Sequence, residues 1–217
     1  MQLLQITGKT ITINGNPFPK PLTEILNMNN SKLFYGIGIN DKTRPARVNS
    51  KAAKQYALWR TMLKRCYDPK CHTKQPTYID CEASDNFKSY SYFYDWCNKQ
   101  IGFNLNGWQL DKDILIPDNK TYSEDSCVFV PQDVNKFFAN CGAVRSNCPV
   151  GVDFHKASGK YRAVCRINSK QQHLGLFNNP EAAFVAYKAF KEAVCKDLAN
   201  KYQDRLDERV FNYMMNW

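Results

Sequence analysis

The chain has 217 residues, of which 43% are hydrophobic and 23% charged, a composition that is typical of globular proteins and excludes a wholly disordered chain. Thirty Lys and Arg against 20 Asp and Glu give a net charge of +10, which favours a polyanionic partner such as nucleic acid. No apolar run approaches the roughly 18 residues of a membrane-spanning helix, and the first residues do not resemble a secretory signal. The nine cysteines are odd in number and scattered, which indicates reduced thiols, so we expect a cytoplasmic protein. We expect no membrane partner.

The first fifty residues are rich in Asn, Gly and Pro and predict an N-terminal extension (1–50) with short strands. Residues 9–16 alternate β-branched with polar side chains and end in Asn-Gly, which predicts a strand and a turn. Residues 34–41 predict a second extended piece, and residues 42–47 an exposed basic loop. Such a loop either reaches phosphates or is simply solvated; its basic residues are Lys42, Arg44 and Arg47.

Two helices follow the extension. Ser50 is a suitable N-cap for a helix over residues 51–67, and apolar side chains recur there at three-to-four spacing. This stripe consists of Tyr56, Trp59, Met62, Leu63 and Cys66. A second helix over residues 85–99 has a broad aromatic face, which we expect to pack in the core rather than to stack on nucleotide bases.

Residues 111–138 predict a β-loop-β-α unit. The second strand is residues 127–130, and Pro131 suits the first turn of the short helix that follows. From Cys148 onward the residue pattern predicts three short strands, at residues 151–154, 161–167 and 171–176.

A helix over residues 181–201 follows these strands, with Pro180 and Glu181 suited to its first turn. Small and apolar residues give it one narrow side that can lie close on a sheet. This side consists of Ala182, Ala183, Ala186, Phe190 and Val194. The fold class is therefore α+β, with a C-terminal three-stranded antiparallel sheet packed on one helix.

Basic side chains gather on one face of this predicted sheet. Alternation along residues 161–167 places Arg162 and Arg166 on the face opposite the helix. Lysines 156, 160 and 170 lie nearby; the candidate DNA-binding residues are thus Lys156, Lys160, Arg162, Arg166 and Lys170. A basic sheet can enter the major groove, where Arg pairs with guanine, although solvated sheets are also commonly rich in Lys and Arg.

The residue pattern of this region resembles that of a known DNA-binding family. Residues 151–156 and 159–163, then His173-Leu174-Gly175-Leu176-Phe177, and then residues 181–187 (Glu-Ala-Ala-Phe-Val-Ala-Tyr) resemble the APETALA/ethylene-response (AP-two) DNA-binding domain over about fifty residues. The resemblance implies that the sheet, and not the helix, reads the major groove of double-stranded DNA.

A second resemblance covers residues 56–138. Tyr56 to Tyr67, the aromatic segment ending at Trp96, the step Leu110-Asp111-Lys112-Asp113-Ile114 and the run from Tyr122 to Pro131, closing with Asn135, resemble phage HNH-type proteins of the ββα-metal class. Many of these are homing-type endonucleases, and several carry a C-terminal AP-two-type module. The cytoplasm would then be that of the host cell.

This second resemblance implies a set of catalytic residues. Asp111 ends the first strand and Asn135 lies on the helix, the positions that hold the metal in this class. Both offer the oxygen ligands that Mg²⁺ or another divalent cation prefers. Asp113 and Lys112 would assist at the phosphate, although Lys112 stands where the family commonly has His and lysine is protonated near neutral pH.

Two alternatives compete with this metal site. The step Asp111-Lys112-Asp113 also fits a solvated charged turn. Cys66, Cys71, His72 and Cys81 have the atom types of a structural zinc site, but their irregular spacing disfavours zinc.

The sequence therefore predicts a DNA-binding HNH-type endonuclease that nicks or cleaves double-stranded DNA by metal-assisted hydrolysis. The predicted domains are the extension (1–50), an HNH-like ββα-metal domain (51–140), an AP-two-type domain (149–202) and a C-terminal tail (203–217). The alternative is a non-catalytic sequence-specific DNA-binding protein, a repressor or anti-defence factor, derived from a decayed HNH nuclease. The missing histidine favours this alternative.

Overall fold

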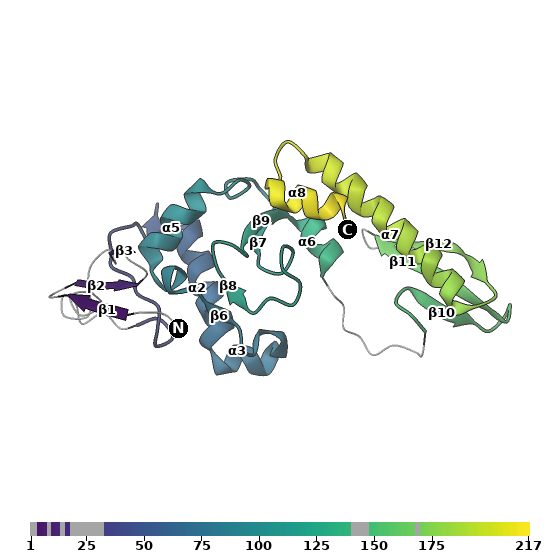
Figure 1. The fold of residues 1–217 in the computed structure, drawn as a ribbon, viewed down its shortest axis with the longest axis horizontal. Coiled ribbons are helices and arrows are strands. Elements are labelled where there is room, and N and C mark those ends of the chain that lie inside the picture. Colours follow the sequence, from purple (N-terminus) through teal and green to yellow (C-terminus); the bar gives the residue numbers. More distant parts are fainter. Residues whose placement is uncertain (1–3, 8–9, 14–15, 18–32, 140–147, 168–169) are drawn as a thin grey trace. The chain divides into compact units, whose positions relative to one another are not determined.

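A computed structural model describes residues 4–7, 10–13, 16–17, 33–139, 148–167 and 170–217 (Figure 1). The chain is α+β, as predicted, and divides into two compact units. Unit 1 comprises residues 1–97 and 120–123, and unit 2 comprises residues 98–119 and 124–217. None of the described helices is long and apolar enough to span a membrane.

Unit 1 begins with small antiparallel sheets. Strands β1 (Leu4–Thr7), β2 (Thr10–Ile13) and β3 (Asn16–Pro17) pair in that order, and β2 falls within the strand predicted over residues 9–16. The Asn14-Gly15 turn predicted there lies outside the described residues. In place of the extended piece predicted over 34–41, residues 35–37 form a turn, closed by a bridge between Phe34 and Gly38.

A tight hairpin precedes the first long helix. Strands β4 (Arg47–Val48) and β5 (Lys51–Ala52) pair antiparallel around Asn49 and Ser50, whose φ angles are +49° and +62°. Positive φ at both central positions is the geometry of a type I′ hairpin turn. The expectation that Ser50 caps a helix is therefore wrong, because the hairpin delays helix α2 to Lys54–Tyr67.

The core of unit 1 is aromatic. The buried residues of α2 are Trp59, Met62, Leu63 and Cys66. The indole N–H of Trp59 donates a 2.9 Å hydrogen bond to the carbonyl of Phe87, which joins α2 to the next helical segment. After α2 come α3 (Pro69–Lys74), a 3-10 turn (Pro76–Tyr78) and strand β6 (Glu82–Ala83), which pairs in parallel with β8 (Thr121–Tyr122).

The predicted aromatic helix over 85–99 is divided in two. Helices α4 (Asp85–Lys88) and α5 (Tyr90–Lys99) are separated at Ser89, because Ile39 exchanges backbone hydrogen bonds with Lys88 and Tyr90 at this point. The aromatic face is buried, as expected for a core; its buried members are Phe87, Tyr90, Phe93 and Trp96.

Unit 2 contains two hydrophobic cores. The first lies around antiparallel strands β7 (Trp108–Asp111) and β9 (Val128–Pro131) and helix α6 (Gln132–Phe138). Helix α8 (Glu208–Met215), within the segment predicted as a tail, contributes Val210 and Met214 to this core.

The second core lies beneath the three-stranded antiparallel sheet β10-β11-β12, which confirms that prediction. Its strands are β10 (Val152–His155), β11 (Lys160–Ile167) and β12 (Lys170–Phe177). Figure 1 shows helix α7 (Pro180–Tyr202) lying along this sheet. The side chain of Asn179 caps α7 by accepting a hydrogen bond from the amide of Ala182.

Helix α7 contributes buried residues to both cores. A single apolar stripe along the helix, as predicted, does not explain this. Ala183 packs in the sheet core, whereas Cys195 and Ala199 pack with β9, α6 and α8. An α-helix turns about 100° per residue, so Ala199 points about 160° away from Ala183. Only Ala183 of the five residues in the predicted stripe is fully buried, because the buried face moves around the helix along its length.

Seven of the eight described cysteines are buried. They behave as small apolar side chains in the cores, as Cys195 does in α7.

Polar contacts also join α7 to α6. Both Lys201 Nζ and the Tyr202 hydroxyl donate 2.8 Å hydrogen bonds to Oδ2 of Asp133. Burial alone would raise the pKa of Asp133, but these hydrogen bonds outweigh burial and hold the pKa below its ordinary value of 3.8. The ionised form of Asp133 is therefore stabilised in the folded protein.

Replacing Asp133 with Asn should lower the free energy of unfolding at pH 7 by roughly 1 kcal/mol, because the ion pair with Lys201 is lost. A carboxyl whose pKa is lower in the folded than in the unfolded protein stabilises the fold at pH values above its unfolded pKa. The stability difference between wild type and variant should therefore fade as the pH drops below about 4. Urea unfolding of the wild type and the variant at pH 7 and pH 3 measures this stability difference. Equal differences at the two pH values would contradict a stabilising role for the ionised Asp133.

Candidate functional site

The candidate metal-binding residues lie on β7 and α6. In the antiparallel β7–β9 pair, Asp111 is the last residue of β7 and lies opposite Val128. Strand β9 leads directly into α6, which carries Asn135 near its middle. Pro131, the residue before α6, lies opposite Trp108, so α6 begins beside the start of β7, at the other end of the strand pair from Asp111.

Asp111 orders the turn that follows β7. Its Oδ1 accepts hydrogen bonds of 2.8 Å from the amides of Asp113 and Ile114. Burial raises the pKa of the Asp111 carboxyl, and the two amide hydrogen bonds oppose this shift. Within the described part of the chain both of these hydrogen bonds go to Oδ1 and none goes to Oδ2.

Asn135 is held against β7 by a residue that the sequence analysis missed. Its Nδ2 donates a 2.9 Å hydrogen bond to Oε1 of Gln109. Gln109 and Asp111 are two residues apart on one strand, so their side chains leave the same face. The Asn135 amide is thereby fixed on the face from which Asp111 also projects, and the two-residue spacing was the signal that could have identified Gln109.

Lys112 is buried within the loop between β7 and β8. It is only 6% exposed, and its ammonium donates hydrogen bonds to the carboxylate of Asp113 and to the carbonyl of Asn119. Asn119 in turn donates a 2.8 Å hydrogen bond from Nδ2 to the carbonyl of Lys112. These contacts make Lys112 a brace of the loop over residues 112–119. The half-exposed carboxylate of Asp113 forms the ion pair with the Lys112 ammonium.

The donor set fits a hard divalent cation that keeps much of its water. Asp111 Oδ2 and Asn135 Oδ1 are oxygen donors, which Mg²⁺ prefers, and Mg²⁺ is commonly held by few protein ligands. Among the described residues there is no group of three or more His, Cys, Asp and Glu side chains that could hold a metal. One residue of the zinc alternative has another partner, since Nε2 of His72 lies 2.8 Å from the carbonyl oxygen of Arg65.

The second candidate surface is the outer face of the sheet β10–β12. Ala163 and Cys165 are buried, whereas Arg166 is exposed, which agrees with the predicted alternation along β11. Arg162 lies opposite Asp153 on β10 and forms a bidentate ion pair with it, at 3.0 and 2.9 Å.

The other basic residues of the sheet are exposed and lie at its turns. Lys156 and Lys160 flank the turn between β10 and β11, and Arg166 and Lys170 lie at the end where β11 passes to β12. None of these four has a carboxylate within ion-pair distance among the described residues. Of the five predicted DNA-binding residues, Arg162 alone is already neutralised within the sheet.

A shallow hollow of roughly 340 Å³ lies beside the start of α6. Its lining includes Trp108, Asp133, Tyr202 and Arg205, so it is the solvent-facing side of the contact between α6 and α7.

Comparison with known proteins adds no assignment: the chain matches no protein-family model, no curated protein and no solved structure.

Replacing Lys112 with Met should lower the free energy of unfolding by about 1–3 kcal/mol, because the carbonyl of Asn119 and the carboxylate of Asp113 lose a charged donor. Urea unfolding measures the change. Lys160→Met, at an exposed position, is the matched control and should cost less than about 0.5 kcal/mol. Equal stability of the two variants would show that Lys112 does not brace the loop.

Proposed function

We propose that this protein is a DNA-binding endonuclease of the HNH type, which nicks or cleaves double-stranded DNA with the help of a divalent cation. One observation carries the proposal: Asp111 ends β7, and Asn135 on α6 is tied to the same face of β7 through Gln109. This order of two antiparallel strands and a helix is the one that the sequence resemblance implies. The oxygen donors on the two elements suit Mg²⁺.

The chain's own residues would position the reacting groups. Asp111 Oδ2 and Asn135 Oδ1 would hold the cation, which supplies electrostatic stabilisation of the charge on the leaving oxygen. Gln109 would orient the Asn135 amide, and the amides of Asp113 and Ile114 would fix the Asp111 carboxylate. Lys112 would act at a distance by bracing the loop.

The sheet β10–β12 would select the DNA site. Exposed cations at both ends of the sheet suit contacts with phosphates, which position a protein on the duplex without reading sequence. Arg166 is exposed for a base contact, whereas Arg162 would first exchange its ion pair with Asp153 for one with DNA. Asp153 would therefore keep Arg162 extended until DNA binds.

A second function is favoured by a specific observation. The ammonium of Lys112 is buried and neutralised, and none of the three histidines lies on β7, β9, α6 or the loop between the strands. Without a general base at the usual place, the same fold suits a non-catalytic, sequence-specific DNA-binding protein such as a repressor or anti-defence factor.

Nicking of supercoiled DNA in Mg²⁺, and its absence in chelator, separates the two functions. Asp111→Asn is the sharpest variant, because an amide oxygen can still accept the two loop hydrogen bonds while the charge that holds the cation is lost. We expect it to nick at least about 100-fold more slowly than the wild type and to bind DNA equally well.

Asp118→Asn removes a charge from the same loop and is the control, since Asp118 is exposed and Asn tolerates its positive φ of 58°. It should nick as fast as the wild type. DNA binding without metal-dependent nicking by the wild type would leave the non-catalytic function in place of the nuclease.

A further inference from the structure

The positive charge of this protein is concentrated in one stretch of unit 1. Residues 42–74 contain ten Lys and Arg and a single acidic residue, Asp68, so they carry a net charge of +9 out of the chain's +10. The ten are Lys42, Arg44, Arg47, Lys51, Lys54, Arg60, Lys64, Arg65, Lys70 and Lys74. The rest of the chain, including the basic sheet, is nearly neutral in total.

Most of these cations are exposed and have no acidic partner. Arg44 forms a bidentate ion pair with Asp95, with both distances 2.7 Å. By contrast, none of seven others has a carboxylate within ion-pair distance in the part of the chain that the structure describes. The seven are Lys42, Arg47, Lys51, Arg60, Lys64, Lys70 and Lys74.

Helix geometry gathers four of them on two successive helices. Helix α2 contains no acidic residue, and its exposed Arg60 and Lys64 are four residues apart, hence on one face. Lys70 and Lys74 are likewise four apart on α3. Asp68 lies between the helices, but its carboxylate caps α3 by accepting a 2.9 Å hydrogen bond from the amide of Lys70.

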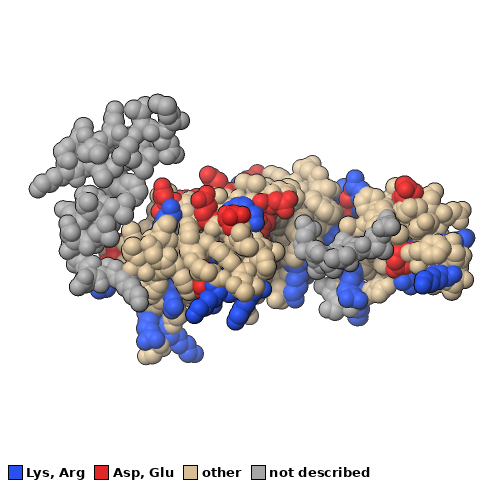
Figure 2. Space-filling model, turned by 90° about the horizontal axis from the view of Figure 1, so that it is seen from below, with Lys and Arg blue, Asp and Glu red and all other residues tan. Residues whose placement is uncertain are grey.

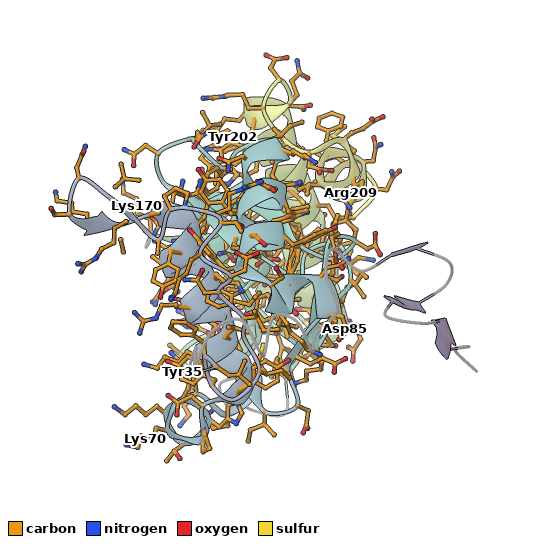
Figure 3. All side chains as sticks on the ribbon, turned by 90° about the vertical axis from the view of Figure 1, so that its left-hand side faces the viewer. Tyr35, Lys70, Asp85, Lys170, Tyr202 and Arg209 are labelled. Atoms are coloured by element: carbon orange, nitrogen blue, oxygen red, sulfur yellow. The ribbon has the colours of Figure 1, made fainter. Side chains whose placement is uncertain are left out.

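Two aromatic rings hold Arg60 in place. The guanidinium of Arg60 lies 5.7 Å from the ring centroid of Phe34 and 5.8 Å from that of Tyr56, within cation-π range. Over unit 1, Figure 2 shows Lys and Arg gathered along one edge of the view and Asp and Glu along the opposite edge. In Figure 3 the Lys70 side chain projects outward from α3.

We infer that the surface formed by Arg60, Lys64, Lys70 and Lys74, the α2–α3 face, binds the phosphate backbone of double-stranded DNA as a contact separate from the sheet. This inference rests on the proposed function, because it takes DNA as the partner. Unpaired Lys and Arg neutralise phosphates and release counterions, the term that dominates non-specific affinity for DNA.

An anionic membrane is the competing polyanion, and the helices do not suit it. Helices that lie on membranes bury an apolar face in the lipid. The apolar face of α2 is instead used in the protein core, since Trp59 and Leu63 have no exposed surface. None of the large hydrophobic residues exposed in the described structure belongs to α2 or α3.

The test measures binding of the full-length chain to random-sequence duplex DNA by fluorescence anisotropy over a range of salt concentrations. Arg60→Gln, Lys64→Gln and Lys70→Gln are combined in one surface variant. The charge-matched control combines Lys99→Gln, Lys188→Gln and Lys196→Gln, at exposed positions outside the α2–α3 face. Circular dichroism checks that both variants fold.

We expect the surface variant to lower the slope of log K against log salt by about 3 in magnitude, close to one per lost phosphate contact. The control should lower it by less than about 1. An unchanged slope in the surface variant, or an equal loss in the control, would overturn the inference. So would a surface variant that loses binding to phosphatidylserine vesicles while its DNA binding is unchanged.

A sheet variant makes failure of this inference distinguishable from failure of the proposed function. Arg162→Gln with Arg166→Gln should remove the preference for duplexes that the wild type enriches from a random pool, whereas the α2–α3 variant should keep that preference. If the wild type binds DNA but only the sheet variant is impaired, the α2–α3 inference fails alone. If the wild type binds no duplex DNA, both fail.

Discussion

Helix α7 packs on two hydrophobic cores with two different faces, and the geometry of the candidate metal site depends on the second of these contacts. Near its start Ala183 lies against Val152 and Ala163 of the sheet. About three to four turns later, Cys195 and Ala199 pack on the core that contains β9 and α6. Small side chains at these contacts allow the helix to approach both partners closely, so α7 holds the strand pair and the sheet within one unit.

The middle of α7 shows how the change of face is accommodated. Lys191 lies between the two contacts, half-buried, with its ammonium 3.5 Å from the ring centroid of Phe137 and donating a 3.2 Å hydrogen bond to the Phe137 carbonyl. Burial lowers the pKa of this ammonium. A long side chain with a polar end can cover apolar surface and still satisfy a backbone carbonyl, which an alanine at this place could not do.

The sequence predicted those elements whose signal is local. Alternation and turn residues identified the three strands of the sheet, and the aromatic spacing of Phe87, Tyr90 and Phe93 identified a core face. The predictions were wrong where a tertiary contact determines where a helix begins or ends. The backbone pairing of Ile39 interrupts the second helix at Ser89, and no periodicity in the helix itself signals that contact.

Two other features left signals that were not used. Leu206, Val210 and Met214 recur every four residues, which predicts an apolar helix face, and they complete the core beside α6. In the candidate site, Asp111 and Asn135 were predicted from a resemblance, and the two-residue spacing of Gln109 from Asp111 is the other unused signal. The burial of Lys112, by contrast, required coordinates. A lysine among two aspartates is expected to stay charged and solvated, and only the fold of the 112–119 loop encloses it.

We propose that Asp111 and Asn135 together hold a divalent cation, and Mn²⁺ titration followed by NMR tests this proposal most directly. In the wild type, paramagnetic Mn²⁺ should selectively broaden the side-chain amide of Asn135 and the backbone amides of Asp113 and Ile114, and Asp111→Asn should abolish this broadening. Uniform broadening, or selective broadening that persists in the variant, would contradict a cation site at Asp111 and Asn135.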